Sequence, residues 1–451
     1  MTTLTKPHLD IAVHSTRDLI DYLARGARPP EQWGVGAEME KLVVDASSGE
    51  AASFAAIEAL LQSLQGSGSW QPVLEAGRLI ALVGPTSSIT LEPGGQLELS
   101  GQLCPDLHCC EGDFACHIRQ IVQAATPLGL AFLGLGVQPF TPLAQIDWVP
   151  KSRYGVMGPY MRRTGDMGER MMKQSAGLQV NLDFADEADC FDKLQTALLL
   201  APVLYALFAN SPLMDGCPSG YLSTRGEIWS RTDPDRTGLL PDLFRPGVGF
   251  ADYVEYALDV PMYFIARQGQ FLDLTAERFP FRRYLAEGHG AHHATLADWD
   301  LHLSTLFPEV RLRPQIEVRC ADSLPPRLSL GLAALSKGIL YDPPARQAVR
   351  TLFSADRASR EELYRRSWRL GLKTPMAGRT LREATLEVLE LAQEGLRRQQ
   401  RRNSRGLDET IYLEGLFEIA DSGVTLAERL LTRWPQERPA QVAALLEHCG
   451  Y

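Results

Sequence analysis

The sequence predicts an α+β fold, with one curved β-sheet around a wet, acidic cavity and helices packed against the sheet. Two observations lead to this prediction. Four widely separated segments alternate apolar and polar residues with a period of two, and their polar sides carry carboxylates and amides. From about residue 330 onward, the apolar residues recur instead at helical spacing. Because no linker separates the four segments, we expect their strands to belong to one domain.

The segment Thr90–Gly101 has the clearest alternation. Gln96 and Glu98 alternate with leucines, which gives a strand one polar and one apolar side. The preceding Pro93-Gly94-Gly95 predicts a turn or bulge, since proline lacks an N–H donor and glycine readily adopts positive φ. Glu92 and Glu98 are therefore expected on either side of a bend in the sheet.

Three further segments, residues 35–44, 178–184 and 315–320, repeat this alternation. Their polar sides carry Glu38 and Glu40, then Gln179, Asn181 and Asp183, and finally Gln315, Glu317 and Arg319. In most antiparallel sheets a polar strand face is simply the solvated side. Glutamate is nevertheless depleted in strands, and two carboxylates about 6–7 Å apart on one face repel each other. Mg²⁺, which prefers oxygen ligands, would relieve that repulsion, and Arg319 would suit a phosphate oxygen.

Composition and charge exclude several classes of partner. The 451 residues are 45% hydrophobic and 22% charged, as in an ordinary soluble globular protein, and the net charge of −10 argues against nucleic acid. The N-terminus lacks the charged and apolar regions of a signal peptide. The most apolar segment, residues 197–209, is too short to span a bilayer and contains Pro202, so we expect a buried helix there. These features predict a cytoplasmic protein with no membrane partner.

The eight cysteines form no paired C-x-x-C array, which makes a structural zinc site an unfavoured interpretation. The cluster from Cys104 to Cys116, together with His108 and His117, could bind metal or sense redox state. The favoured interpretation is that these are thiols of a reduced protein, several of them buried on a helix after the Glu98 strand.

Local patterns predict the other elements. We expect helices over residues 15–25, 53–65 with Ser53 as N-cap, 113–128 and 381–396, and strands near 79–83, 89–91 and 130–137. Residues 151–177, rich in Arg, Met and Gly, are expected to form a semi-ordered loop beside a site. The arginines that follow residue 396 are expected on a solvated face near a helix C-terminus.

Six motifs, in order along the chain from about residue 33 to about 435, resemble the plant-type glutamate–cysteine ligases, a type that also occurs in bacteria, and we expect a bacterial member. The motifs are Glu-X-Glu-Lys at 38–41, Leu-Glu-Pro-Gly-Gly-Gln-Leu-Glu-Leu-Ser-Gly at 91–101, Leu-Gln-Val-Asn-Leu-Asp-Phe at 178–184, Asp-Arg-Thr-Gly at 235–238, Tyr-Ala-Leu-Asp-Val-Pro-Met-Tyr-Phe at 256–264 and Phe-Pro-Glu-Val-Arg-Leu at 307–312.

The resemblance implies a fold similar to glutamine synthetase and the guanido kinases: a curved, mainly antiparallel six-stranded sheet that forms a funnel, with helices outside. It implies a single catalytic domain over residues 1–451, with a C-terminal helical region, residues 340–451, packed on it. The implied reaction joins the γ-carboxylate of L-glutamate to the amine of L-cysteine at the expense of ATP, through γ-glutamyl phosphate, in the first step of glutathione synthesis. Such a reaction needs no enzyme nucleophile, and the sequence offers no convincing Ser-His or Cys-His arrangement.

By the same resemblance, each candidate site residue receives a role. The implied Mg²⁺ ligands are Glu38, Glu40, Glu92, Glu98, Gln179 and Glu317. Arg319 and Asn181 are implied to bind ATP, with Arg319 also neutralising the transferring phosphoryl group. Arg225, Tyr263 and Gln179 are implied to bind glutamate, with Arg225 paired to its α-carboxylate. The alternatives are a core aromatic for Tyr263 and a surface ion pair for Arg225.

One departure concerns cysteine. Plant enzymes of this family carry cysteine pairs that form regulatory disulfides, and the matching pairs are absent here, although a different disulfide among Cys104 to Cys116 stays open. Two other functions also stay open: a ligase of the same fold that joins glutamate to a different amine, and a non-catalytic, redox-responsive binding protein. The expected partners are glutamate, cysteine and ATP, and the expected state is a monomer or a homodimer.

Overall fold

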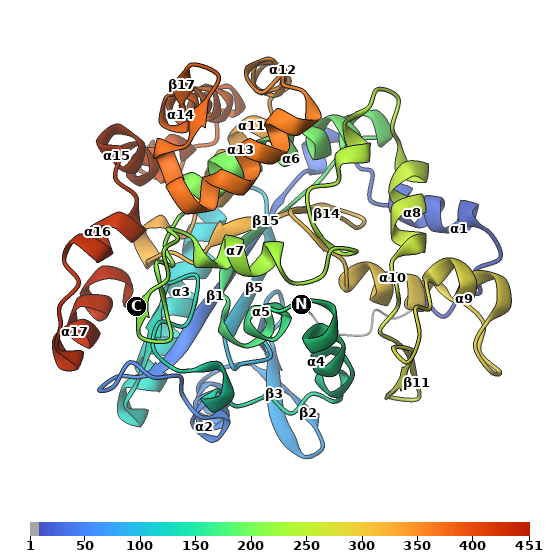
Figure 1. The fold of residues 1–451 in the computed structure, drawn as a ribbon, viewed down its shortest axis with the longest axis horizontal. Helices are drawn as coiled ribbons and strands as arrows, with labels where there is room; N and C mark the ends of the chain where they lie inside the picture. Colours follow the sequence, from blue (N-terminus) through green and yellow to red (C-terminus); the bar gives the residue numbers. More distant parts are fainter. Residues whose placement is uncertain (1–8) are drawn as a thin grey trace.

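The structure, a computed structural model, describes residues 9–451 and is built around one antiparallel sheet (Figure 1). Its strands run in the order β14-β15-β7-β1-β5-β4-β3-β2, and β6 pairs with the far end of β1. In chain order they are β1 (Val35–Asp45), β2 (Gln71–Glu75), β3 (Arg78–Val83), β4 (Ser88–Leu91), β5 (Leu97–Cys104), β6 (Leu130–Leu133), β7 (Gly177–Leu182), β14 (Val310–Leu312) and β15 (Ile316–Asp322). The four acidic segments are thus neighbours, β15-β7-β1-β5, as predicted.

The sheet has nine strands, so the expected number of six is wrong. Two local features add strands at its margins. The eleven residues of β1 are enough to pair with β5 and β7 and then, over Leu42–Asp45, with β6. Ala76 and Gly77, both at positive φ, reverse the chain so that the largely solvent-facing β2 pairs with β3.

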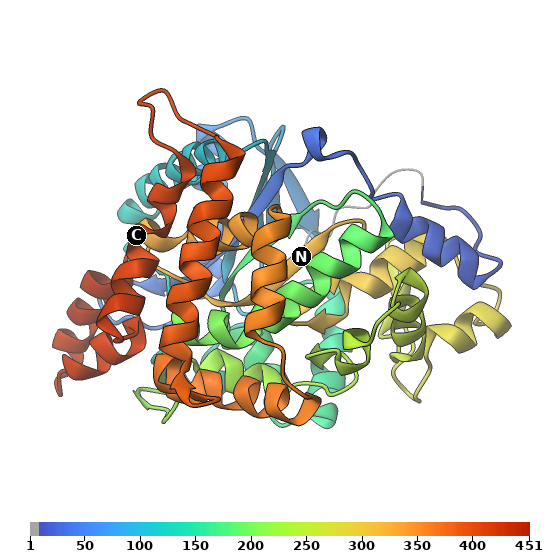
Figure 2. The ribbon, with the colours of Figure 1, turned by 90° about the horizontal axis from the view of Figure 1, so that it is seen from above.

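Alternation along the central strands separates an apolar from a polar face. Ala37 and Met39 of β1 are buried in the main hydrophobic core, while Glu38 and Glu40 project to the opposite side. The apolar face is covered by α6 (Glu187–Leu207) and α11 (Gly331–Leu340), with α14 (Leu381–Gln399) outside them (Figure 2). Figure 1 looks onto the other face, in front of which lie three short helices: α4 (Ser152–Thr164), α5 (Gly168–Gln174) and α7 (Thr224–Ser230).

The remaining elements surround this centre. The other helices are α1 (Thr16–Ala24), α2 (Phe54–Ser67), α3 (Leu107–Ala125), α8 (Phe250–Asp259), α9 (Phe281–Glu287), α10 (Leu296–Ser304), α12 (Pro343–Leu352), α13 (Arg357–Leu370), α15 (Glu414–Ser422), α16 (Leu426–Thr432) and α17 (Arg438–Cys449). The short strands are β8 (Leu213–Met214), β9 (Cys217–Pro218), β10 (Thr237–Gly238), β11 (Phe264–Arg267), β12 (Gln270–Asp273), β13 (Phe307–Pro308), β16 (Pro375–Met376) and β17 (Arg379–Thr380).

Two helix starts show how capping sets the boundaries. The Ser53 hydroxyl accepts from the backbone N–H of Ala56, which confirms it as the N-cap of α2. α3 begins at Leu107, six residues earlier than expected, because the Asp106 carboxylate accepts from the backbone N–H of Cys109 and caps the helix there.

The apolar segment expected as a buried helix is the second half of α6. By length and composition α6 could cross a membrane, but almost all of its residues lie inside the molecule, packed on β15 and on surrounding helices. It is therefore the core helix of the apolar face.

The expectation of a loop over residues 151–177 is wrong, because this stretch forms α4 and α5. Its methionines, among them Met157, Met161 and Met172, are buried against the sheet and supply the apolar contacts that order the helices. The predicted turn at Pro93-Gly94-Gly95 is confirmed, and it docks against the end of α5. A Cβ at Gly94 would lie 2.1 Å from the Lys173 carbonyl oxygen, so only glycine fits.

Candidate active site

A narrow cavity opens between the polar face of the sheet and the short helices α4, α5 and α7. Its polar lining comes from the central strands, the turn before β5 and the starts of α4 and α7. The lining residues are Glu40, Glu92, Pro93, Gln96, Arg153, Tyr154, Met157, Met171, Met172, Ser175, Gln179, Arg225, Trp229, Phe307, Arg311 and Arg319. The cavity therefore combines carboxylates, arginines and a methionine-rich wall.

Strand register places the carboxylates beside one another. Glu40 on β1 lies opposite Glu98 on β5, and Glu38 lies opposite Gln179 on β7. Glu98 is completely buried and accepts a hydrogen bond from the Thr90 hydroxyl at 2.8 Å. Four segments far apart in sequence thus bring their acidic residues to one place, as predicted from their alternation.

The amide side chains of β7 link these carboxylates. Gln179 Nε2 donates to Glu40 Oε1 at 3.0 Å, and Asn181 Nδ2 donates to Glu38 Oε1 at 2.9 Å. The backbone N–H of Gly177 donates to the second oxygen of Glu40. The buried Asn181 Oδ1, by contrast, has no hydrogen-bond partner within the described residues, so this acceptor is free to bind a ligand.

Burial and mutual repulsion favour the protonated forms of two glutamates. Burial and the nearby charges of Glu98 and Glu317 raise the pKa of Glu38 to about 8. Burial and the charges of Glu92 and Glu98 raise the pKa of Glu40 to about 7. A cation bound between these two carboxylates would favour their ionised forms.

Glu317 has the opposite environment. Arg311, directly across from it on β14, binds both its oxygens at 2.8 and 2.9 Å, and Arg319 donates to it as well. Burial alone would raise the pKa of Glu317, but the charges of Arg311 and Arg319 hold it at about 2. Glu317 is thus a permanently ionised carboxylate that orients two arginines.

Arg225, on the first turn of α7, presents unused donors to the cavity. Its Nη2 donates to the Arg319 carbonyl oxygen at 3.0 Å, whereas its buried Nε and Nη1 have no partner within residues 9–451. Trp229, one turn further along α7, lies 5.6 Å from the Arg225 guanidinium and keeps its own buried N–H unpartnered. Buried donors of this kind indicate a place for an anion.

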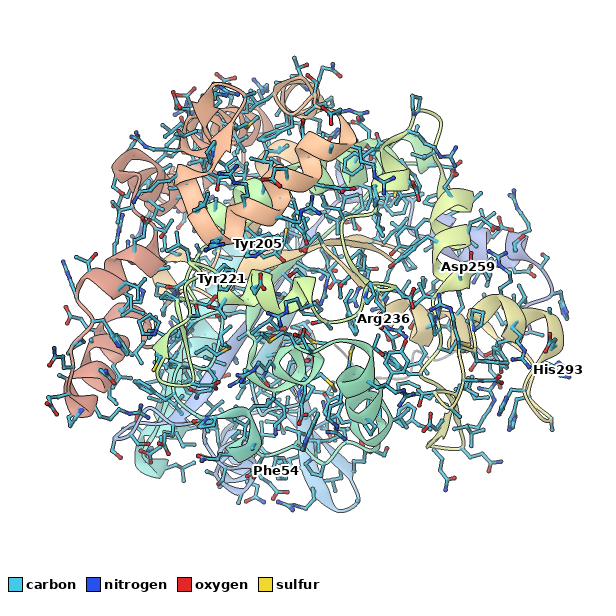
Figure 3. All side chains as sticks on the ribbon, in the orientation of Figure 1. Phe54, Tyr205, Tyr221, Arg236, Asp259 and His293 are labelled. Atoms are coloured by element: carbon cyan, nitrogen blue, oxygen red, sulfur yellow. A yellow bond between two sulfur atoms is a disulfide. The ribbon has the colours of Figure 1, made fainter. Side chains whose placement is uncertain are left out.

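Glu309 lies beside the two arginines, and within the described residues its carboxylate has no hydrogen bond to either guanidinium. Its carboxylate accepts from the hydroxyls of Tyr205 on α6 and Tyr364 on α13, and a small cavity next to it is also lined by Arg225 and Arg319. Figure 3 labels Tyr205 close to α7 and α13. Since neither guanidinium donates to Glu309, the unpartnered Nε and Nη1 of Arg225 remain available to a ligand.

Tyr263 lies apart from the other predicted residues. It is buried beneath the guanidinium of Arg236, which lies 3.9 Å from the Tyr263 ring, and its hydroxyl donates to Met161 Sδ. Figure 3 labels Arg236. Arg236 is itself fully buried and paired with Asp233. This environment matches the core-aromatic alternative for Tyr263, and a role in binding glutamate stays a prediction.

Residues 34–448 match glutamate-cysteine ligase family 2 (GCS2) over nearly the whole chain. The chain belongs to glutamate-cysteine ligase family 2. Among curated proteins, it is 41% identical over 428 residues to the chloroplastic glutamate–cysteine ligase of Medicago truncatula, which covers 93% of this chain and 83% of the relative. It is 40% identical over 439 residues to the chloroplastic enzyme of Arabidopsis thaliana, which covers 96% of this chain and 82% of the relative.

Among solved structures, the chain is similar to the glutamate–cysteine ligase of Francisella tularensis in complex with AMP, with a TM-score of 0.54. That match covers 92% of this chain and 88% of the other, at 13% sequence identity, and so supports the shared fold alone. It agrees with a mainly antiparallel sheet surrounded by helices.

The structure contains one disulfide, although the sequence favoured free thiols throughout. Cys104, at the end of β5, is bonded to Cys109 in the first turn of α3, so the expectation of free thiols is wrong for this pair. The two residues meet because β5 leads directly into α3, with only four residues between the two cysteines in the sequence. The six other cysteines are free, as predicted.

Three cavity residues of this glutamate-cysteine ligase family member were not predicted from its sequence: Arg153, Arg311 and Trp229. Arg153 is buried, lies beside Glu92 in the cavity lining and has an unpartnered Nε. Arg153 was not predicted as a site residue because residues 151–177 were expected to form a loop rather than a helix that positions its side chain. Arg311 lies directly across from Glu317 on the neighbouring strand. Its place in the alternation of β14 could therefore have predicted that it faces the same side as Glu317.

The donor chemistry of the cavity fits a hard divalent cation, but no metal site is preformed. Within residues 9–451, no three side chains of His, Cys, Asp or Glu are already grouped to hold a metal ion. Glu38 and Glu40 instead accept from the amides of β7, while Gln179 and Glu317 accept from Arg319. The unpartnered Asn181 oxygen and the raised pKa values of Glu38 and Glu40 are what a cation would satisfy.

Proposed function

We propose that this chain is a glutamate–cysteine ligase that joins the γ-carboxylate of L-glutamate to the amine of L-cysteine and converts ATP to ADP and phosphate. Membership of glutamate-cysteine ligase family 2 supports the activity. The observation that carries it is one cavity in which electron-rich carboxylates face arginines with unused donors. Such a cavity suits two anionic substrates that must be held close together.

The chemistry requires positioning rather than a protein nucleophile. A γ-carboxylate oxygen of glutamate bonds to the γ-phosphorus of ATP, and ADP leaves with the electrons of the broken P–O bond. The cysteine nitrogen then attacks the carbonyl carbon of γ-glutamyl phosphate and loses a proton, and phosphate leaves with the former carboxylate oxygen. Each step brings negative groups together, so charge neutralisation is the main task of the site.

Arg225 binds the α-carboxylate of glutamate in this proposal. Its unpartnered Nε and Nη1 are charged donors from which the oxygens of a carboxylate can accept. The methionines of the cavity lining and Phe307 supply apolar surface that suits the less polar parts of the substrates.

Arg319 faces the transferring phosphoryl group, held in place by Glu317 and Gln179. Mg²⁺ would supply the charge that offsets the phosphates of ATP. We propose Glu38, Glu40, Glu92 and Glu98 as the carboxylates that hold it, with Gln179 and Glu317 completing the set, and Asn181 as a contact to ATP.

Wider features of the enzyme are proposed on the same basis. The sheet forms a funnel of the glutamine synthetase type, and residues 1–451 act as one catalytic domain with the helical region 340–451 packed on it. The enzyme is bacterial and cytoplasmic, works as a monomer or a homodimer, and takes small molecules as its partners.

The experiment that tests the function is phosphate release from ATP in the presence of glutamate, with and without cysteine. We expect release to depend on glutamate and to rise when cysteine is added, with γ-glutamylcysteine as product. If phosphate release were faster with a different amine than with cysteine, that amine would be the substrate in place of cysteine. The absence of ATP-dependent amide formation with any amine would overturn the proposal.

A further inference from the structure

The N-terminus of α7, which carries Arg225, is fastened to the C-terminal end of β15 by a buried carboxylate. Asp322, the last residue of β15, is 1% exposed. Its Oδ1 accepts from the Ser223 hydroxyl at 2.7 Å, and its Oδ2 accepts from the Ser211 hydroxyl at 2.7 Å and from the backbone N–H of Asn210 at 2.8 Å. Hydrogen bonds to a carboxylate are among the stronger ones in a protein interior.

Ser211 and Ser223 connect Asp322 to the first turn of α7 through hydrogen bonds. Ser223 is the N-cap of α7, and its hydroxyl accepts from the backbone N–H of Gly226 while donating to Asp322. The Ser211 hydroxyl accepts from the backbone N–H of Arg225 itself, at 3.2 Å, while donating to the same carboxylate. Each hydroxyl therefore bridges Asp322 to a donor of the first turn.

The other end of Arg225 is tied to the same strand. Its Nη2 donates to the Arg319 carbonyl oxygen of β15, three residues before Asp322. The guanidinium lies over Gly177 of β7, where a Cβ would come within 2.7 Å of Nη2. Hydrogen bonds thus hold both the backbone and the guanidinium of Arg225 against β15, and of the guanidinium nitrogens only Nε and Nη1 have no partner within the described residues.

We propose that Asp322, Ser211 and Ser223 are positioning residues for the glutamate site. They set the start of α7 against β15 so that the unpartnered donors of the Arg225 guanidinium lie in the cavity together with Arg319. This inference rests on the proposed function, since it assigns Arg225 to the glutamate carboxylate. It adds three buried residues, none of which lines the cavity, to the machinery that selects the amino acid.

The test compares Ser223→Ala with Ser53→Ala, both of which remove an N-cap hydroxyl. Ser53 caps α2, and its hydroxyl contacts no residue of the site. We expect Ser223→Ala to raise the KM for glutamate about tenfold, with the KM for ATP within about twofold of wild type. Ser53→Ala is expected to leave both constants unchanged. Circular dichroism and thermal melting establish that each variant is folded.

Equal KM values for glutamate in Ser223→Ala and wild type, or an equal rise for glutamate and ATP, would overturn the inference. Should Ser223→Ala not fold, Ser211→Ala decides by the same two constants, because it leaves the N-cap hydroxyl in place. The proposed function fails separately: wild-type protein would then form no amide at all, whereas failure of this inference alone leaves wild-type activity intact.

Discussion

Two carboxylates of the cavity, only two strands apart, experience opposite electrostatics. Glu40 is surrounded by other acids and amides, so its ionised form is disfavoured. Glu317 lies between Arg311 and Arg319, so its ionised form is held firmly. Residue type and strand alternation predicted that both would face the cavity. Their charge states could not be predicted, because they depend on neighbours from other strands.

The first prediction compares Glu40→Gln with Glu317→Gln. Both should reduce ligation by at least about a hundredfold, since each removes charge from the site of phosphoryl transfer. Only Glu317→Gln should destabilise the fold, by about 3 kcal/mol, because it leaves two buried arginines without their carboxylate. Urea unfolding of the metal-free variants, alongside turnover, checks both parts. Equal stability of the two variants would contradict the charge assignments.

The second prediction concerns pH. The pKa of Glu40 is raised by burial from its ordinary 4.5 to about 7, so folding is opposed by its ionisation as pH rises through that interval, and the full penalty is present above it. Glu40→Gln removes this penalty. In the presence of EDTA, we expect the variant to gain more stability over wild type at about pH 8 than at about pH 5. A pH-independent difference between the two proteins would show that Glu40 is not perturbed.

The third prediction concerns Arg225. Loss of a charge-assisted carboxylate pair in Arg225→Ala should raise the KM for glutamate about ten- to a hundredfold, with little change in the KM for ATP. Steady-state kinetics with each substrate varied in turn measures both. An unchanged KM for glutamate would remove Arg225 from the glutamate site.

Among individual residues, prediction from sequence succeeded where strand alternation applied. Glu38, Glu40, Gln179 and Glu317 lie together because period two fixes their side of the strand. Tyr263 has no such constraint, since it comes just before the short strand β11, and it is found beneath Arg236 in the core instead.

Among the elements, close helix packing depends on glycines whose role the sequence does not display. α11 and α14 cross where a Cβ at Gly395 would lie 1.9 Å from the Gly338 carbonyl oxygen. The helical periodicity of residues 381–396 predicted α14 but not its partner. α4 and α5 were missed for another reason: the arginines and glycines of residues 151–177 were interpreted as loop signals, although Tyr154, Met157 and Met161 recur at helical spacing.

The fourth prediction tests this crossing. Gly395→Ala should destabilise the protein by about 1–3 kcal/mol, because the added methyl group forces the two helices apart. The matched control is Gly112→Ala in α3, where a Cβ meets nothing within 4 Å. There the higher helix propensity of alanine should stabilise the fold by about 0.5–1 kcal/mol. Thermal or urea unfolding distinguishes the two signs, and two shifts of the same sign would contradict the crossing geometry.

At the scale of the whole molecule, the sheet gathers residues 38 to 319 around one cavity, and helices from the last third of the chain cover its other face. The sequence predicted this gathering, because four acidic strands without a linker between them have to share one sheet. It did not predict the total of nine strands. β2 joins the edge of the sheet through the turn that leads to β3, and β6 joins because β1 is long enough to pair with it.

The sheet brings these residues together so that an oxygen of glutamate can attack ATP. The decisive measurement is therefore the fate of that oxygen. Glutamate labelled with ¹⁸O in its γ-carboxylate is incubated with the enzyme, ATP and cysteine, and the released phosphate is analysed by mass spectrometry. Transfer of one labelled oxygen into each phosphate is the expected result, because the acyl phosphate carries it there. Release of unlabelled phosphate during amide formation would contradict the mechanism.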